Sequence, residues 1–238
     1  MLLEERLDEI VKIVNERGSI SNQELVKMFG ASESTIRRDI TTLANDNRVI
    51  RVHGGAMSVV SGGGMEDSEV SARRIQNSDE KIKIARIAAE LVEDESVIFL
   101  DASTSAYFMI PFLAEKRNLI VITNGIKALT ALSENNISCI GTGGEVINSC
   151  LAFVGEEAHR TIERYNADCC FFACRGISED GRLTDISQPE NSVRAKMLEH
   201  SKQSFMLCTS DKMNKVYYHN LCSADDISGV INVEEKDI

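Results

Sequence analysis

The stretch ASESTIRRDITTLANDNRVIRVHGGA, residues 31–56, decides the fold of the first part of the chain. Ser32 is suited to cap a helix, and the helix that it opens carries Ile36, Ile40 and Leu43 at helical spacing. The next eight residues, RVIRVHGG, alternate between polar and apolar in the way of a small hairpin. The stretch therefore predicts a helix followed by a hairpin.

Two further helices are predicted upstream. The first stops near Gly18 and has apolar residues at helical spacing, namely Leu3, Leu7, Ile10, Val11 and Val14. Ser21 and Glu24 form a capping-box pattern, which opens a short helix closed by Gly30. Three residues of that short helix are expected to face inward: Leu25, Met28 and Phe29. Three helices and a hairpin indicate a winged helix-turn-helix domain over residues 1–57.

The third helix is predicted to present a face suited to the major groove of double-stranded DNA. With Ile36 on the buried side, Arg38 falls on the opposite side and Arg37 on the flank. Arginine reads guanine, while hydroxyls and further arginines hold phosphates. We assign DNA contact to ten residues of the helix and hairpin: Ser32, Ser34, Thr35, Arg37, Arg38, Thr41, Arg48, Arg51, His53 and Gly54. A solvated charged face is the alternative, but a basic hairpin beside a complete trihelical unit favours DNA.

The net charge of −11 argues at first against a nucleic-acid partner, but it is distributed unevenly. Residues 1–60 carry a net charge of −1, and the remainder carries −10. Within the small part, residues 37–53 have a local excess of two positive charges. Local charge decides whether a surface meets phosphate, so DNA binding by the first domain stays compatible with the composition.

Composition excludes several other classes of protein. Hydrophobic residues make up 43% and charged residues 26%, which are ordinary globular values. No apolar run reaches the length of a membrane span, and the acidic start MLLEERLDEI does not resemble a signal peptide. Seven cysteines without a Cys-x-x-Cys pattern support neither a disulfide framework nor a zinc site. We expect a reduced, soluble, cytoplasmic protein without metal or cofactor.

A linker and a larger α/β domain are predicted after the hairpin. Residues 58–77 include a glycine triplet and lack periodicity, so we assign them as a linker, and residues 78–238 as the second domain. A helix over 78–92 is expected to bury Ile82, Ala85, Ala88, Ala89 and Val92. Apolar strand candidates then lie at 97–102, 119–124, 138–142, 169–174, 204–209 and 229–233. Helices are expected at 104–116, kinked or ended early by Pro111, and at 126–135, 156–165 and 189–200. This alternation predicts a parallel sheet covered by helices.

Polar and glycine-rich loops follow these strands, where parallel sheets bind ligands. The loop at the end of the strand 97–102 opens a helix and carries Asp101, Ser103, Thr104 and Ser105. These residues form either a phosphate-binding site or an ordinary N-cap. Further candidates for effector binding lie in later loops: Thr123, Asn124, Gly143, Gly144, Arg175 and Lys212.

The stretch from residue 23 to 56 resembles the signature of the DeoR-type family of bacterial transcriptional regulators, with its Thr-Ile-Arg-Arg-Asp and Arg-x-His-Gly-Gly-Ala motifs. The resemblance implies a second domain similar to sugar-phosphate isomerases and coenzyme-A transferases, which senses a phosphorylated sugar. The family's Asp-x-Gly-Thr-Thr phosphate loop matches residues 101–105, with Ser103 and Ser105 as small hydroxylated replacements. Glu190 and Lys196 match an acid and a base common in the family, and we count Glu190 as a further candidate for effector binding. Thr209 stands where the family tends to have aspartate, which leaves the identity of the sugar open.

These features together predict a repressor of sugar-metabolism genes whose operator binding is controlled by a phosphorylated sugar. The alternative is a sugar-phosphate isomerase that carries a DNA-binding head. CRGISEDG, residues 174–181, stands where the isomerases have a run of acids, which disfavours an enzyme. An architectural DNA-binding protein would have no use for an anion site. Since one small head contacts few bases, we expect a homo-oligomer, a dimer or tetramer.

Overall fold

The computed structural model of the chain describes residues 3–17, 19–45, 48–52, 54–58 and 76–233. It contains two compact units, residues 1–78 and 79–238. We call them the head and the sensor unit, the second after the role that the family resemblance implies. His53 and most of the linker predicted at 58–77 lie outside the described residues.

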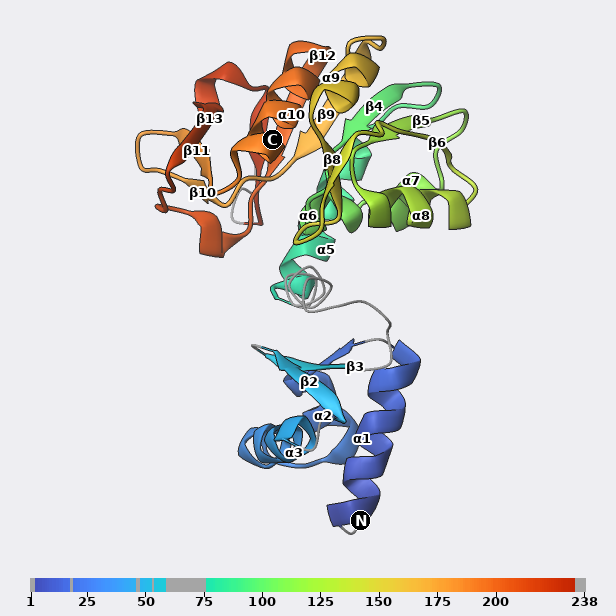
Figure 1. Cartoon of the computed structure of the whole chain (residues 1–238), viewed down its shortest axis with the longest axis vertical. Coiled ribbons are helices and arrows are strands. Elements are labelled where there is room, and N and C mark those ends of the chain that lie inside the picture. The colour runs from blue at the N-terminus through green and yellow to red at the C-terminus, as the bar shows by residue number, and fades with distance from the viewer. Residues whose placement is uncertain (1–2, 18, 46–47, 53, 59–75, 234–238) are drawn as a thin grey trace. The chain divides into compact units, whose positions relative to one another are not determined.

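The head consists of three helices and a three-stranded antiparallel sheet (Figure 1). Its elements are α1 (Leu3–Arg17), β1 (Ser19–Ser21), α2 (Asn22–Phe29), α3 (Glu33–Asn45), β2 (Val49–Val52) and β3 (Gly55–Ser58). The strands lie in the order β1-β3-β2, so the predicted hairpin of β2 and β3 pairs with a short strand before α2. This arrangement is a winged helix-turn-helix.

Local signals in the sequence account for the boundaries of these elements. Ser21 and Glu24 form the predicted capping box at the start of α2, and Gly30 ends it in the left-handed conformation with φ 61°. Gly55 begins β3 where a Cβ would lie 2.2 Å from the carbonyl oxygen of Ile20, so β1 and β3 approach each other only with glycine there.

The head has its own hydrophobic core. Ile36, Ile40 and Leu43 of α3 are buried as predicted, together with Leu25 of α2. Met28 is an exception, because 47% of it is exposed and the prediction that it faces inward is wrong. Leu25 of α2 is fully buried in this core, and Phe29, also predicted to face inward, is partly buried against it.

The sensor unit is built on a six-stranded parallel sheet in the order β14-β12-β9-β4-β5-β6 (Figure 1). The strands are β4 (Val97–Leu100), β5 (Ile120–Thr123), β6 (Ser138–Gly141), β9 (Ala167–Phe172), β12 (Ser201–Leu207) and β14 (Gly229–Ile231). Each overlaps one of the six predicted strands, and the parallel α/β class is confirmed.

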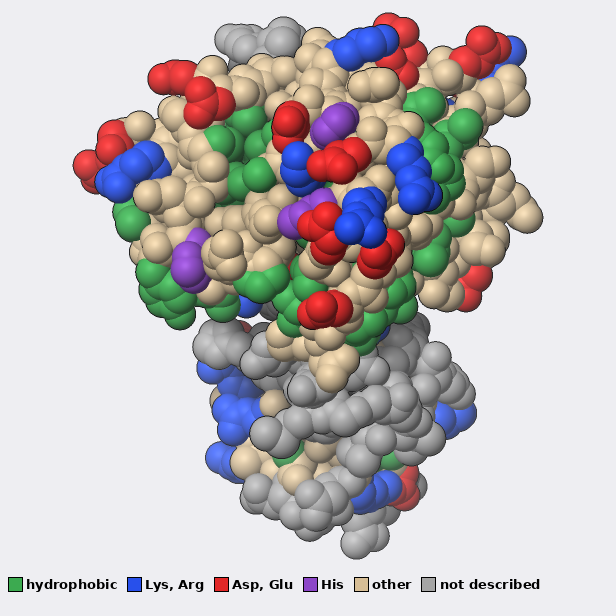
Figure 2. Space-filling view, turned by 45° about the horizontal axis from the view of Figure 1, so that its top comes forward, with side chains coloured by type: hydrophobic (Ala, Val, Ile, Leu, Met, Phe, Trp, Pro, Cys, Tyr) green, Lys and Arg blue, Asp and Glu red, His purple; other side chains and the backbone are tan. Residues whose placement is uncertain are grey.

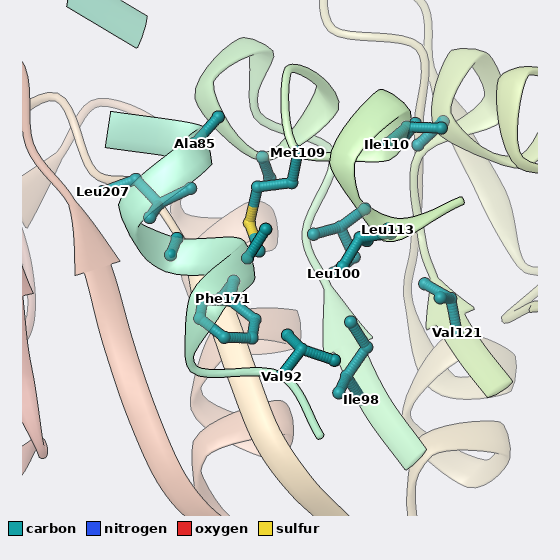
Figure 3. Packing of buried hydrophobic residues seen from close by; sticks show 14 of the residues in the cluster. Ala85, Val92, Ile98, Leu100, Met109, Ile110, Leu113, Val121, Phe171 and Leu207 are labelled. Carbon is teal, nitrogen blue, oxygen red and sulfur yellow. The ribbon is translucent and has the colours of Figure 1, made fainter. Parts of the chain in front are cut away.

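Helices cover both faces of this sheet. They are α5 (Ser78–Glu90), α6 (Thr104–Tyr107), α7 (Ile110–Leu113), α8 (Ile126–Glu134), α9 (Glu156–Ile162) and α10 (Gln188–Glu199). On one face Ile98, Leu100 and Phe171 pack against α5, α6, α7 and α8 (Figure 3). On the other face Phe99 and Phe172 pack against α9 and α10. Alternate residues of one strand therefore enter different clusters, which is why these strands read as continuously apolar.

Two predicted helices differ in detail from those observed. The helix predicted at 104–116 is divided into α6 and α7, and Pro111 lies in the first turn of α7, where its missing N–H is tolerated. In α5, Ile82 is 38% exposed, contrary to prediction. Lys81 and Ile84 belong to the buried face instead, and Ile82 lies at its edge.

Five short strands of the sensor unit were not predicted. β7 (Glu145–Ile147) and β8 (Ala152–Val154) form a hairpin. β10 (Gly176–Ile177), β11 (Arg182–Asp185) and β13 (His219–Ser223) form a second, antiparallel sheet. Two single turns of 3-10 helix, η1 (Ser210–Lys212) and η2 (Ala224–Asp226), complete the unit.

Candidate DNA-binding face and effector site

The exposed side of α3 carries the two arginines that the sequence singled out. Arg37 and Arg38 are exposed, as is Ser34. Arg37 pairs with Glu33 one turn earlier, with 2.6 Å between Nη2 and Oε1. Among the described residues Arg38 has no ion-pair partner, so its guanidinium remains available to a ligand.

Hydroxyl groups at the start of α3 contact one another. The Oγ of Ser32 lies 2.9 Å from that of Ser34 and 2.8 Å from Oγ1 of Thr35, and it accepts the amide of Thr35. Ser32 therefore caps α3. Thr41 is half-buried and donates its hydroxyl to the carbonyl of Arg37 at 2.7 Å, whereas Thr42, which the sequence argument passed over, is exposed.

Asp39, which follows the two arginines, is buried whereas they are exposed. It accepts two hydrogen bonds from Arg6 of α1, at 2.7 Å from Nε and 3.2 Å from Nη2. The Arg-Arg-Asp motif thus combines two exposed cations with one buried anchor, and sequence periodicity did not reveal the partner 33 residues away.

The hairpin contributes further cations. Arg48 pairs with Asp8 of α1 at 2.6 Å, and Arg51 is exposed on β2. Gly54 turns between β2 and β3 with φ 96°. The hairpin is therefore tied to α1 at Arg48, while Arg51 has no ion-pair partner among the residues described.

In the sensor unit, the predicted effector residues other than Glu190 lie at or after the carboxyl ends of parallel strands. Leu100 of β4 is in register with Thr123 of β5 and with Phe171 of β9, so the loops after these strands begin side by side. A Cβ on Gly125 would lie 3.0 Å from Cα of Ala102, which shows how closely the first two loops approach.

The loop at 101–105 is shaped by Asp101. Asp101 is buried, and its Oδ1 accepts the amide of Ser103 at 2.9 Å. Ser103 caps α6 by accepting the amide of Ala106 at 3.2 Å. Thr104 is half-buried and Ser105 is buried. Since the first amides of a helix have no partner within it, the backbone of Thr104 and Ser105 supplies the donors that this loop offers.

Arg194 of α10 joins three acids around this loop, and sequence reasoning missed it. Its Nε donates to Asp101 at 3.0 Å, Nη1 to Asp185 at 2.9 Å and Nη2 to Glu190 at 3.3 Å. Burial alone would lower the pKa of Arg194, but the neighbouring groups, Asp101 foremost, raise it, so the guanidinium stays charged.

The basic side chain that forms an ion pair with Glu190 is therefore that of Arg194 and not that of Lys196. Lys196 pairs with Glu163 and Glu199, each at 3.0 Å. Such pairs are common on the surface of the unit, and Figure 2 shows basic and acidic side chains intermixed on the visible face.

The loops after β5 and β6 offer mainly backbone groups. Thr123 is buried, and its Oγ1 accepts the amide of Gly125 at 3.0 Å. Asn124 is buried and donates Nδ2 to the carbonyl of Phe153 at 3.1 Å. Gly143 has φ 67° and Gly144 φ 114°, and a Cβ on Gly144 would lie 2.4 Å from the carbonyl oxygen of Val154. These glycines are required by the backbone, whatever else they do.

Two cations belong to the remaining loops. Arg175 follows β9 and is half-buried. Lys212 donates Nζ to the carbonyl of Leu207 at 3.2 Å, and burial lowers its pKa although nearby Cys208, Cys174 and Asp101 favour its charged form. Burial also raises the pKa of Cys174 to about 12, so this thiol stays protonated at neutral pH.

Within the described part of the chain, no cluster of His, Cys, Asp and Glu has the form of a metal site. No described helix is long and apolar enough to cross a membrane. All seven cysteines are free thiols.

A winged helix-turn-helix with exposed arginines, joined in one chain to an α/β unit with polar loops at its carboxyl edge, defines a DNA-binding transcriptional regulator. Two family models match the chain: the DeoR-like helix-turn-helix domain over residues 6–61 and the DeoR C terminal sensor domain over residues 76–233. The chain belongs to the DeoR family, as the resemblance implied.

Similar proteins are regulators as well. The chain is 37% identical to the uncharacterized HTH-type transcriptional regulator YulB of Bacillus subtilis, over 97% of this chain and 89% of that one. It is 30% identical to the lactose phosphotransferase system repressor of Staphylococcus aureus, over 95% and 90%. Among solved structures, ribose 5-phosphate isomerase A of Methanocaldococcus jannaschii matches 58% of this chain and 55% of its own, with a TM-score of 0.45 and 18% identity.

Proposed function

We propose that this regulator represses genes of sugar uptake or metabolism in the cytoplasm, and that a phosphorylated sugar bound to the sensor unit lowers its affinity for operator DNA. Similarity to the lactose phosphotransferase system repressor supports the link to sugar uptake. Arg37, Arg38 and the hairpin would contact a double-stranded operator, as a homo-oligomer on repeated half-sites.

One observation carries the effector assignment. Asp101, the acid that begins the 101–105 loop, is paired with Arg194. The amides and hydroxyls of Thr104 and Ser105 lie at the start of a helix in the same loop. Lys212 adds positive charge near Asp101. A buried unpaired carboxylate would repel phosphate, whereas Asp101 is compensated by Arg194. Because Arg194 is shared with Asp185 and Glu190, the positive charge toward a phosphate would come from Lys212 and Arg175.

The sugar moiety would lie over the neighbouring loops. Asn124 follows β5 and Arg175 follows β9, the strands on either side of β4, and Gly144 follows β6, the next strand beyond β5. Hydroxyl groups of a short sugar chain would come within reach of these loops. Asp101 and Glu190, which the sequence argument counted as effector-binding, act in this proposal through Arg194 and position the loop.

An isomerase activity has less support. Proton abstraction from a sugar needs an ionised carboxylate that is free to accept a proton. Both oxygens of Asp101 and of Asp185 accept hydrogen bonds from protein groups, and Glu190 pairs with Arg194. We therefore propose that the unit senses its ligand without converting it.

Thermal unfolding of the full chain tests the proposal. Phosphorylated sugars of three to six carbons are compared with their unphosphorylated forms, and a ligand at one hundred times its Kd adds about 2.7 kcal/mol to stability. Thr104→Glu should abolish the response, whereas Thr130→Glu, an exposed threonine on α8, should retain it. The ligand that stabilises the protein should also weaken its binding to operator DNA. A screen without any stabilising phosphosugar, or an unchanged response in Thr104→Glu, contradicts the proposal.

A further inference from the structure

An acidic residue lies at the N-terminus of α3, the part of the helix that would contact DNA. Glu33 is the first residue of the helix and its side chain is 54% exposed. The N-terminal residues of a recognition helix are those that contact base edges in the major groove. Phosphates repel a carboxylate at this position, so a favourable contact with DNA there needs a group that donates a hydrogen bond to it.

Capping of the helix does not account for this carboxylate. Ser32 already accepts the amide of Thr35 and so caps α3. In α2, by contrast, Glu24 completes the capping box by accepting the backbone amide of Ser21 at 3.0 Å. Among the described residues Glu33 contacts no backbone amide, and its carboxylate pairs with the Arg37 side chain.

The pairing orients both side chains. Arg37 is 62% exposed, yet its Nη2 lies 2.6 Å from Oε1 of Glu33 across one helical turn. One contact to the carboxylate leaves other N–H donors of the guanidinium available. The pair thus presents an acceptor and a donor group side by side at the exposed start of α3.

We propose that Glu33 is a specificity-determining residue, which accepts a hydrogen bond from the N4 amino group of cytosine while Arg37 contacts the neighbouring guanine. This inference rests on the proposed use of α3 as the recognition helix. In the major groove cytosine offers a donor and guanine offers acceptors, so an acid–arginine pair matches a C–G step.

Selection of bound duplexes from a random DNA library tests this role whatever the sequence of the operator. The wild type should prefer cytosine at one position of each half-site by about tenfold, the value of an ordinary base contact. Glu33→Gln should shift that preference toward adenine, which glutamine reads, and Glu33→Ala should remove it. Glu9→Gln, which changes a partly exposed acid of α1 paired with Lys12, is the matched control and should keep the wild-type preference.

Two further measurements separate a base contact from a structural role. The salt dependence of binding should be unchanged in Glu33→Gln, because no phosphate contact is lost. In a double-mutant cycle, Glu33→Ala should have a smaller effect on cytosine preference when Arg37 is already alanine. Melting curves of each variant establish that the head is folded.

The outcomes distinguish this inference from the proposed function. If Arg38→Ala abolishes DNA binding while Glu33→Gln and Glu33→Ala select the same sequences as the wild type, α3 binds DNA and Glu33 does not determine specificity. If Arg38→Ala and Arg37→Ala both bind as the wild type does, the recognition face itself is misassigned and the role of Glu33 falls with it.

Discussion

The Nε of Arg194 lies 3.0 Å from Oδ2 of Asp101, and this contact joins α10 to the end of β4 across 93 residues of sequence. The other oxygen of Asp101 accepts the amide of Ser103. The same guanidinium donates to Asp185 at the end of β11. Arg194 therefore connects the loop proposed to hold phosphate with both the parallel sheet and the smaller antiparallel sheet.

Replacing Arg194 with methionine should strongly destabilise the sensor unit. Removal of one partner from a buried ion pair costs about 3–5 kcal/mol, because the carboxylates of Asp101 and Asp185 remain buried without compensation. Urea denaturation of the full chain measures the loss. The control is Arg182→Met, which removes an exposed pair with Asp180 and should change stability little. Equal stability of both variants would contradict the structural role of Arg194.

Replacing Asp39 with alanine should loosen α3 in the head. Asp39 is buried and Arg6 retains partial access to water, so we expect a loss of about 2–3 kcal/mol, below that of a fully buried pair. Faster hydrogen exchange of α1 and α3 amides in the full chain would report it. The exposed pair of Arg37 and Glu33 gives the comparison, since Glu33→Ala should leave these exchange rates nearly unchanged.

Features with local causes were predictable from the sequence. The buried stripe of Ile36, Ile40 and Leu43 follows from helical periodicity, and the capping box of Ser21 and Glu24 lies within four residues. Central strands such as VIFL of β4 and IVIT of β5 are apolar along most of their length because both faces of the sheet are covered. Each of these signals is complete within a short stretch of chain.

Features that depend on distant partners were not predictable. Nothing near Arg194 in the sequence indicates Asp101, and nothing near Asp39 indicates Arg6. The strand β10 has only two residues, and β11 and β13 contain polar residues, as in RLTD and HNLCS, so none of the three carries an apolar run. Their pairing is determined by tertiary contacts that periodicity does not record.

Acid should weaken the sensor unit partly through Asp168. Its side chain accepts hydrogen bonds from Lys202 and from the amide of Val97, and these lower its pKa. The stabilisation is complete above the unfolded pKa of about 3.9 and is lost as the pH falls through the lower folded value. The stability difference between wild type and Asp168→Asn should therefore be constant above about pH 5 and shrink in more acidic solution.

Urea denaturation at a series of pH values between neutrality and strong acid measures this difference. Lys202→Met removes the largest cause of the lowered pKa, so the loss of stability should be smaller and should be complete at a higher pH than in the wild type. A difference between wild type and Asp168→Asn that does not vary with pH would show that the carboxylate contributes no proton linkage.

Arg38 and Arg51 should affect DNA binding in different ways. Both are exposed and, in the described part of the structure, neither has an ion-pair partner, but Arg38 lies on α3 and Arg51 on the hairpin. If Arg38 reads guanine, Arg38→Gln should cost about 1–3 kcal/mol and relax specificity at one base pair. If Arg51 contacts phosphate, Arg51→Gln should weaken binding to all sequences alike and reduce the salt slope by about one. Fluorescence anisotropy over a range of salt concentrations, on a selected duplex and its single-base variants, measures both quantities. Arg182→Gln in the sensor unit should leave them unchanged, and the assignment of α3 and the hairpin is wrong if the two head variants behave like this control.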